Sequence, residues 1–123
     1  MSQKEPEPTA IIELPQEIKT SIASSQDKLA EDIVVMDLSE LTSFTDYFIV
    51  MQGNSNKQNT ALCDHIERTL KNLKIKPLSV EGRNQADWIL MDYGYFIIHI
   101  FTSEMRQYYA LEKLWGDAPR LSF

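Results

Sequence analysis

The sequence is short of cysteine and of long apolar runs, and each shortage excludes a class of protein. Cys63 is the only cysteine, so an intramolecular disulfide is excluded and a reducing compartment is expected. The longest apolar runs, 47–51 and 95–101, are far shorter than the ~20 residues that a membrane-spanning helix needs. The first ten residues, MSQKEPEPTA, hold no apolar signal core. We therefore expect a cytoplasmic protein with no membrane partner.

Basic residues are outnumbered, because 12 lysines and arginines face 18 aspartates and glutamates, a net charge of −6. Nonspecific affinity for nucleic acid comes mainly from Lys and Arg side chains that displace counterions from phosphates. The composition therefore argues against direct binding of nucleic acid and favours a basic protein partner. Segment 57–76 is mainly basic and segment 77–105 mainly acidic. Two solvated faces explain this pattern, and an acidic surface that steers a cationic partner is the alternative.

A phosphate-binding loop is also missing. Gly53 ends an apolar segment that leads into a predicted helix, and a helix N-terminus can hold a phosphate. The segment matches neither Gly-x-x-x-x-Gly-Lys-Ser nor Gly-x-Gly-x-x-Gly. Nucleotidyl transfer further needs two carboxylates at i and i+2 on a strand to hold Mg²⁺, and no carboxylate between Gly53 and Asp92 has another two residues later. A transferase of that kind would lack its metal ligands.

The remaining reactive side chains are isolated from one another. His99 lies in the apolar segment YFIIHIF, a setting typical of a hydrogen-bonded core histidine. Cys63 and His65 lie two residues apart on a predicted helix, where they do not face each other, so a Cys-His dyad is excluded. The three or four ligands that zinc requires are not present at suitable spacing. We predict that the protein is not an enzyme and has no cofactor and no metal site.

Residues 1–15, with Pro6, Pro8 and scattered acids, are predicted to form a mobile tail. What the sequence contains beyond them is clear periodicity, which predicts a single domain over 16–123. Helical patterns lie at 16–30, 56–73 and 102–116, and strand-like segments lie at 32–39, 46–53, 76–82, 86–94 and 95–101. The order αββαβββα favours an α/β sandwich around a mixed five-stranded sheet. Strand, helix, strand favours a parallel crossover, and the hairpins impose antiparallel pairs.

Two of the predicted helices carry apolar stripes that we expect to pack on the sheet. The stripes are Ile18, Ile22 and Leu29 in the first helix and Leu62, Ile66, Thr69 and Leu73 in the second. Ser55 and Gln58 fit a capping box at the start of the second helix, in which the glutamine reaches back to the cap. The cap explains these residue types without a ligand. Thr102 or Ser103 is expected to cap the closing helix.

The aromatic residues gather in the second half. Residues 81–119 hold both tryptophans and four of the five tyrosines. On a strand, Trp88, Leu90 and Asp92 share one face, while Ile89, Met91 and Tyr93 share the other. Trp88 is a candidate interface residue or a core residue, and Trp115 is expected in the core.

Three stretches carry a resemblance to a known family: DLSELTSFTDYFIVMQGNSNKQ, EGRNQADWILMDYGYFIIHIF and EMRQYYALEKLWGDAP. In order and spacing they closely resemble the ribosomal silencing factor (RsfS, Iojap-like) family over about residues 16–119. The chain departs from the family pattern at Tyr95, where the family often has an acid, and at Ala86, where it often has a glycine.

The resemblance implies a nucleotidyltransferase-like α/β fold without transferase activity. It further implies binding to ribosomal protein uL-fourteen on the large ribosomal subunit, which sterically prevents the small subunit from joining and so represses translation. The family signature falls on the strand, hairpin and closing helix. The partner-binding residues that we predict from it are Trp88, Asp92, Tyr93, Glu104, Arg106 and Tyr109. A nucleotide-binding transferase, an adaptor for another protein and a homodimer in the absence of the ribosome remain open alternatives.

Overall fold

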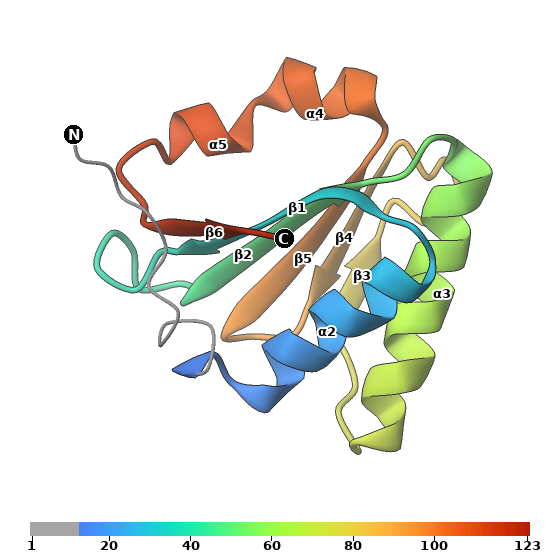
Figure 1. Ribbon diagram of the computed structural model, residues 1–123, viewed down its shortest axis with the longest axis horizontal. Helices are drawn as coiled ribbons and strands as arrows, with labels where there is room; N and C mark the ends of the chain where they lie inside the picture. The colour runs from blue at the N-terminus through green and yellow to red at the C-terminus, as the bar shows by residue number, and fades with distance from the viewer. Residues whose placement is uncertain (1–12) are drawn as a thin grey trace.

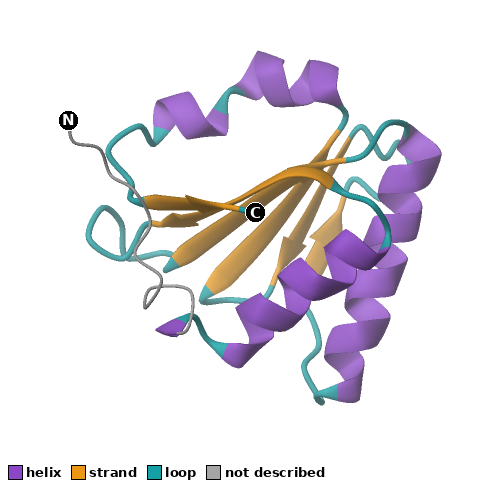
Figure 2. Ribbon diagram, viewed as in Figure 1, coloured by secondary structure: helices purple, strands orange, loops and turns teal. Residues whose placement is uncertain are grey.

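The computed structural model describes residues 13–123 and shows one six-stranded sheet with helices on both faces (Figure 1). The strand order is β3-β4-β5-β2-β1-β6. In chain order the elements are α2 (Gln16–Asp27), β1 (Glu31–Asp37), β2 (Tyr47–Gln52), α3 (Asn56–Asn72), β3 (Ser79–Glu81), β4 (Trp88–Asp92), β5 (Phe96–Phe101), α4 (Ser103–Tyr109), α5 (Leu111–Leu114) and β6 (Arg120–Ser122). Helices α2 and α3 cover one face of the sheet, and α4 and α5 lie over the other (Figures 1 and 2).

The mixed character of the predicted sheet is confirmed. β1 and β2 form an antiparallel hairpin, and β3, β4 and β5 are antiparallel neighbours. β2 and β5 pair in parallel, with Tyr47 opposite Phe96 and Gln52 opposite Phe101. Helix α3 lies between them in the chain, as a parallel crossover requires. Gly94, with φ of 93°, supplies the tight reversal between β4 and β5.

The sheet has a core on each face. The larger core lies under α2 and α3 and includes Ile18, Leu62, Ile66, Ile89 and Ile98, all fully buried. The smaller core lies on the face of α4 and α5 and centres on Phe48, Val50 and Phe101. Its cover is incomplete, because Trp88, Leu90 and Trp115 are only partly buried there. Among the described residues, no helix is long and apolar enough to cross a membrane.

The prediction of the two apolar stripes is correct except for the last residue of each. Leu29 is 76% exposed because α2 ends at Asp27 and Leu29 turns to φ of 63° beyond it. Leu73 is 43% exposed and follows the last helical residue, while Leu70 takes the buried position. The predicted tail up to residue 12 lies outside the described residues. Of its last residues, Leu14 is 7% exposed and belongs to the larger core.

The end of the chain differs from the prediction in two ways. The closing helix is not continuous, because Ala110 adopts φ of 49° and ψ of 51° and separates α4 from α5. A sixth strand, β6, pairs antiparallel with β1, with Leu121 opposite Val35. Gly116 and Pro119, just before β6, indicate the end of a helix, and the short segment after them has no strand pattern of its own, so the sequence did not predict this strand.

The start of α3 confirms the cap and changes one detail of it. The Ser55 hydroxyl accepts from the Gln58 amide at 3.0 Å, as predicted. The Gln58 side chain, however, accepts from the amide of Asn54 at 2.6 Å rather than from that of Ser55. Its Nε2 also donates to the Lys28 carbonyl at 2.9 Å, so one glutamine joins the α3 N-terminus to the end of α2.

Candidate functional site

Trp88 opens β4 on the sheet face that carries α4 and α5, and its indole is half-buried. Its Nε1–H donates to Nδ1 of His99 at 3.1 Å. The ring centroid lies 4.3 Å from that of Tyr109, at the end of α4, and 5.3 Å from that of Phe101. Trp88 is therefore held in one orientation by a hydrogen bond and two rings while part of its surface stays accessible.

His99 is the buried support of this arrangement. It is 3% exposed, and burial lowers its pKa from 6.5 to about 3, so the imidazole is neutral at physiological pH. Because Nδ1 accepts from Trp88, the ring proton belongs on Nε2. Nε2 has no hydrogen-bond partner among the described residues, and the ring meets Phe48 edge-on at 4.5 Å. The structure agrees with the interpretation of His99 as a core residue.

The same contacts continue across the sheet as a row of aromatic rings, which we call the aromatic row. Its members, from α4 to the β1–β2 loop, are Tyr109, Trp88, His99, Phe48, Trp115 and Phe44. The middle is buried, with Phe48 at 5% exposure, and the two ends are open, with Tyr109 at 40% and Phe44 at 56%. Sequence reasoning did not single out Phe48 or Phe44. Only the pairing of β2 with β5 brings Phe48 to the side of His99, and Phe44 joins through its contacts with Phe48 and Trp115.

The two predicted acids lie on this side of the molecule in different roles. Asp92 is half-buried at the far end of β4 from Trp88, and its Oδ1 accepts from the amide of Gly94 at 2.8 Å, which closes the β4–β5 turn. Glu104 is exposed in the first turn of α4, near the Thr102 cap. The Glu104 carboxylate is therefore accessible to a partner. Asp92 is accessible only in part, because its Oδ1 is already bonded to the turn.

Tyr93 does not join Trp88. It lies on the opposite face, 8% exposed, in the larger core, with its ring stacked on Phe96 at 4.9 Å and an interplanar angle of 4°. Burial raises the pKa of its hydroxyl. The strand alternation explains this separation, because residues five apart point to opposite faces of a sheet.

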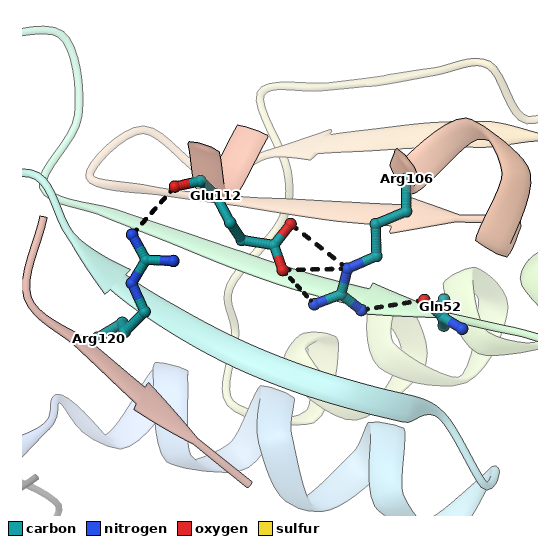
Figure 3. Close-up of polar contacts among 4 residues, drawn as sticks. All are labelled: Gln52, Arg106, Glu112 and Arg120. Carbon is teal, nitrogen blue, oxygen red and sulfur yellow. Dashed lines mark hydrogen bonds and ion pairs between the residues drawn. The ribbon is translucent and has the colours of Figure 1, made fainter. Parts of the chain in front are cut away.

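Arg106 is also largely withdrawn from the surface, at 9% exposure (Figure 3). Its Nη2 donates to Glu112 Oε2 at 2.7 Å and its Nη1 to Gln52 Oε1 at 3.3 Å. Arg120, on β6, donates to the Glu112 carbonyl at 3.0 Å. These contacts join α4, α5, β2 and β6, so Arg106 fixes the two short helices over the sheet.

The glycine turn has a packing explanation. A Cβ at Gly53 would lie 2.2 Å from Oδ1 of Asn59, which is fully buried and donates through Nδ2 to the Ala86 carbonyl at 2.9 Å. The open hollow beside the turn, about 390 Å³, is lined by Glu31 and Glu104, whose charges repel a phosphate. Within residues 13–123 no three His, Cys, Asp or Glu side chains are grouped as metal ligands.

Ala86 itself lies in the left-handed region, with φ of 62°, and is 3% exposed. This conformation favours glycine, which is the residue that the silencing-factor pattern often has there. Two hydrogen bonds hold the backbone of Ala86 in this conformation. Its carbonyl accepts from Asn59 and its amide donates to the Gly82 carbonyl at 2.8 Å.

The family of the chain follows from its sequence match. The model of the family described as "Ribosomal silencing factor during starvation" matches residues 11–123. The chain belongs to this family. Among curated relatives, the ribosomal silencing factor RsfS of Bacillus subtilis is 40% identical over 102 residues, which covers 83% of this chain and 86% of the relative. A mouse relative, named mitochondrial assembly of ribosomal large subunit protein 1, is 34% identical over 70% of this chain and 39% of its own length.

Solved structures support the fold of this silencing-factor chain. A crystal structure of a protein from Chromobacterium violaceum superposes with a TM-score of 0.80 at 34% identity, covering 82% of this chain and 84% of the other. A second crystal structure, from Bacillus halodurans, gives a TM-score of 0.75 at 32% identity, covering 85% and 94%. The resemblance and the α/β fold with one mixed sheet are thereby confirmed, apart from the sixth strand.

Proposed function

We propose that this protein represses translation by binding the large ribosomal subunit through ribosomal protein uL-fourteen and sterically blocking the small subunit. The support is membership of the silencing-factor family, together with relatives named for ribosome silencing and for assembly of the ribosomal large subunit. As a binding protein it performs no catalysis and needs no cofactor.

The binding surface that we propose begins at Trp88 and Tyr109. Their rings are in contact, and a ring pair that is rigid and half-exposed is typical of an interface hot spot. Glu104 and Asp92 give the same side of the molecule the charge that a basic protein requires. The acids steer the partner and the aromatic rings provide the desolvated contact. Tyr93 and Arg106 act in this proposal from inside the fold, by supporting the β4–β5 turn and α4.

A nucleotidyltransferase is the weaker alternative. Its case depends on Gly53, and the close approach of Asn59 accounts for that glycine without a ligand. Titration of the protein with ATP or CTP in the presence of Mg²⁺ separates this alternative from a binding protein. A pull-down against purified large subunits separates a silencing factor from an adaptor for some other protein.

The test of the surface is co-sedimentation with purified large subunits at low and high salt. Trp88→Ala is expected to weaken binding at least about tenfold at both salt concentrations, because truncating a central aromatic anchor costs about 2 kcal/mol or more. Trp88→Phe keeps a ring against Tyr109 and is expected to retain most of the affinity. Glu104→Gln is expected to weaken binding mainly at low salt.

Circular dichroism first shows that each variant is folded. If folded Trp88→Ala binds as the wild type does, the proposed surface is wrong. If the wild type binds neither large subunits nor isolated uL-fourteen, the proposed function itself fails.

A further inference from the structure

A second exposed apolar area lies at the other end of the aromatic row, where none of the predicted partner-binding residues is found. We call it the loop–α5 patch, and its residues are Leu41, Phe44, Leu114 and Trp115. Leu114 is 71% exposed, Phe44 56% and Leu41 42%, and Trp115 is half-buried. An open hollow of about 410 Å³ is lined by Leu41, Leu114 and Trp115. The β1–β2 loop and α5, about 70 residues apart in the chain, thus expose apolar side chains together.

The patch is held rigidly from beneath. The Trp115 ring lies 6.3 Å from Phe44 and 6.3 Å from Phe48, the latter edge-on at 88° and buried in the smaller core. The Trp115 carbonyl accepts from Arg120 at 3.2 Å, which ties the end of α5 to β6. Single exposed leucines are ordinary, whereas a fixed contiguous group of large apolar side chains marks an interaction site.

The rim of the patch is acidic, which indicates the chemistry of its partner. Segment 38–46 contains Glu40 and Asp46 and no lysine or arginine, and Asp117 borders the hollow. Lys113 is the one base that lines the hollow. Anionic lipid and nucleic acid are repelled by such a rim, while a protein segment with apolar and basic side chains is attracted.

The patch and Trp88 are close enough for one partner to cover both. Both areas lie on the same sheet face. Phe48, which supports Trp115 of the patch, is on β2, two strands from Trp88 on β4. Its partner on β5 is Ile97, four residues before Phe101, the partner of Trp88, so strand spacing and residue rise place Phe48 and Trp88 roughly 16 Å apart. An interface of standard size, about 800 Å² per partner, is roughly 32 Å across if circular.

We propose that the loop–α5 patch is a second contact area for the same basic protein of the large subunit that Trp88 engages. This inference rests on the proposed function and extends its contact surface to Phe44 and Leu114. The buried middle of the aromatic row keeps the two contact areas in fixed relation, so the partner meets a preorganised surface.

Leu114→Ser and its matched control Leu29→Ser test the patch. Leu29 is 76% exposed and lies two residues beyond the end of α2, the helix that covers the other face of the sheet. Binding to large subunits and to isolated uL-fourteen is measured with Trp88→Ala alongside. Leu114→Ser and Phe44→Ala are each expected to weaken binding about fivefold or more at all salt concentrations, and Leu29→Ser by less than twofold. Glu40→Gln is expected to slow association at low salt only.

The outcomes are distinct. If Trp88→Ala weakens binding while Leu114→Ser and Phe44→Ala behave as Leu29→Ser does, the patch proposal is wrong and the proposed function stands. If the wild type does not bind, the proposed function fails first. If Leu114→Ser changes only the sedimentation of the free protein, the patch contacts a second copy of this chain and the proposal is overturned.

Discussion

At the scale of single residues, Gly53 shows how a packing requirement resembles a ligand-binding signal. The glycine follows β2 and precedes α3, the position that a phosphate-binding turn would occupy. Its backbone amide donates to the Phe101 carbonyl at 3.1 Å, so this amide is already bonded within the fold. The space where a Cβ would stand holds the Asn59 amide, which is itself fixed by the Ala86 carbonyl.

Gly53→Ala is therefore expected to destabilise the protein by about 1–3 kcal/mol, the range for overpacking a rigid interior. Urea denaturation measures the change. In an Asn59→Ala background, which removes the clashing atom, the same substitution is expected to cost less than half as much. Equal costs in the two backgrounds would show that the contact with Asn59 is not the reason for the glycine.

His99 predicts a pH dependence of stability. Its folded pKa, about 3, lies below the unfolded value of 6.5 because burial disfavours the imidazolium. Between these two pKa values the imidazole is protonated in the unfolded chain and neutral in the folded chain, so stability is lost as the pH falls below 6.5. This contribution is fully present above pH 6.5 and decreases by ~2 kcal/mol between pH 7 and pH 5.

Urea unfolding at pH 7 and pH 5 tests this with His99→Gln, which lacks the titrating group. Its loss of stability on acidification is expected to be smaller than that of the wild type by ~2 kcal/mol. Trp88→Phe retains the buried histidine but loses the indole donor to Nδ1, so it should keep the part of the dependence that comes from burial. An unchanged pH dependence in His99→Gln would mean that His99 takes up its proton at the same pH in the folded and unfolded states.

At the scale of elements, the closing region consists of two short helices because their packing requires a bend. Ala110 takes a left-handed conformation at the junction, and its amide donates to the Arg106 carbonyl at 2.9 Å. The bend allows Glu112 on α5 to face Arg106 on α4 (Figure 3). It also places Trp115 against Phe48, so the smaller core and the loop–α5 patch both depend on it.

Ala110→Gly is expected to stabilise the protein by about 0.5–1 kcal/mol. Glycine removes a left-handed penalty of about 1–2 kcal/mol, and its greater freedom in the unfolded chain offsets part of the gain. Ala61→Gly, at an exposed position inside α3, is the matched control and should destabilise by about 0.5–1 kcal/mol. Thermal denaturation distinguishes the two signs. Destabilisation by Ala110→Gly would show that the alanine methyl group has a packing role.

At the scale of the whole molecule, the two faces of the sheet differ in how completely helices cover them. The face with α2 and α3 is closed over the larger core, as buried residues such as Ile18 and Ile66 show. The face with α4 and α5 leaves Trp88 and Trp115 half-covered and exposes apolar side chains at both ends of the aromatic row. A molecule with one closed face and one rigid, partly open face is suited to docking on a larger partner.

The proposed steric mechanism predicts that the bound protein prevents subunit joining. Large subunits preincubated with saturating protein are expected to show a strongly reduced light-scattering increase when small subunits are added. Trp88→Ala at the same concentration should restore joining, because it no longer occupies its site. Addition of ATP or CTP should change neither result. Normal joining while the wild type stays bound would leave a ribosome-binding protein that does not block the small subunit.

The secondary structure of the chain could mostly be predicted from the sequence by itself. Apolar periods placed α2, α3 and five of the six strands, and the cap residue placed the start of α4. The Ser55 cap was readable from its spacing, and alternation along β4 separated Trp88 from Ile89. These features depend on residues within a few positions of one another, where backbone geometry sets which side chains share a face. The family, too, was recognisable from three stretches of sequence.

Only the tertiary structure decided which of these residues stay accessible. Arg106 and Glu104 are two positions apart, yet one is buried against Gln52 and Glu112 and the other is exposed. Gly53 depends on Asn59 and Ala86, and β6 exists because β1 has a free edge to pair with. Such contacts join segments distant in the chain, so no local pattern encodes them, and the cover of a sheet face is known only when every element is in place.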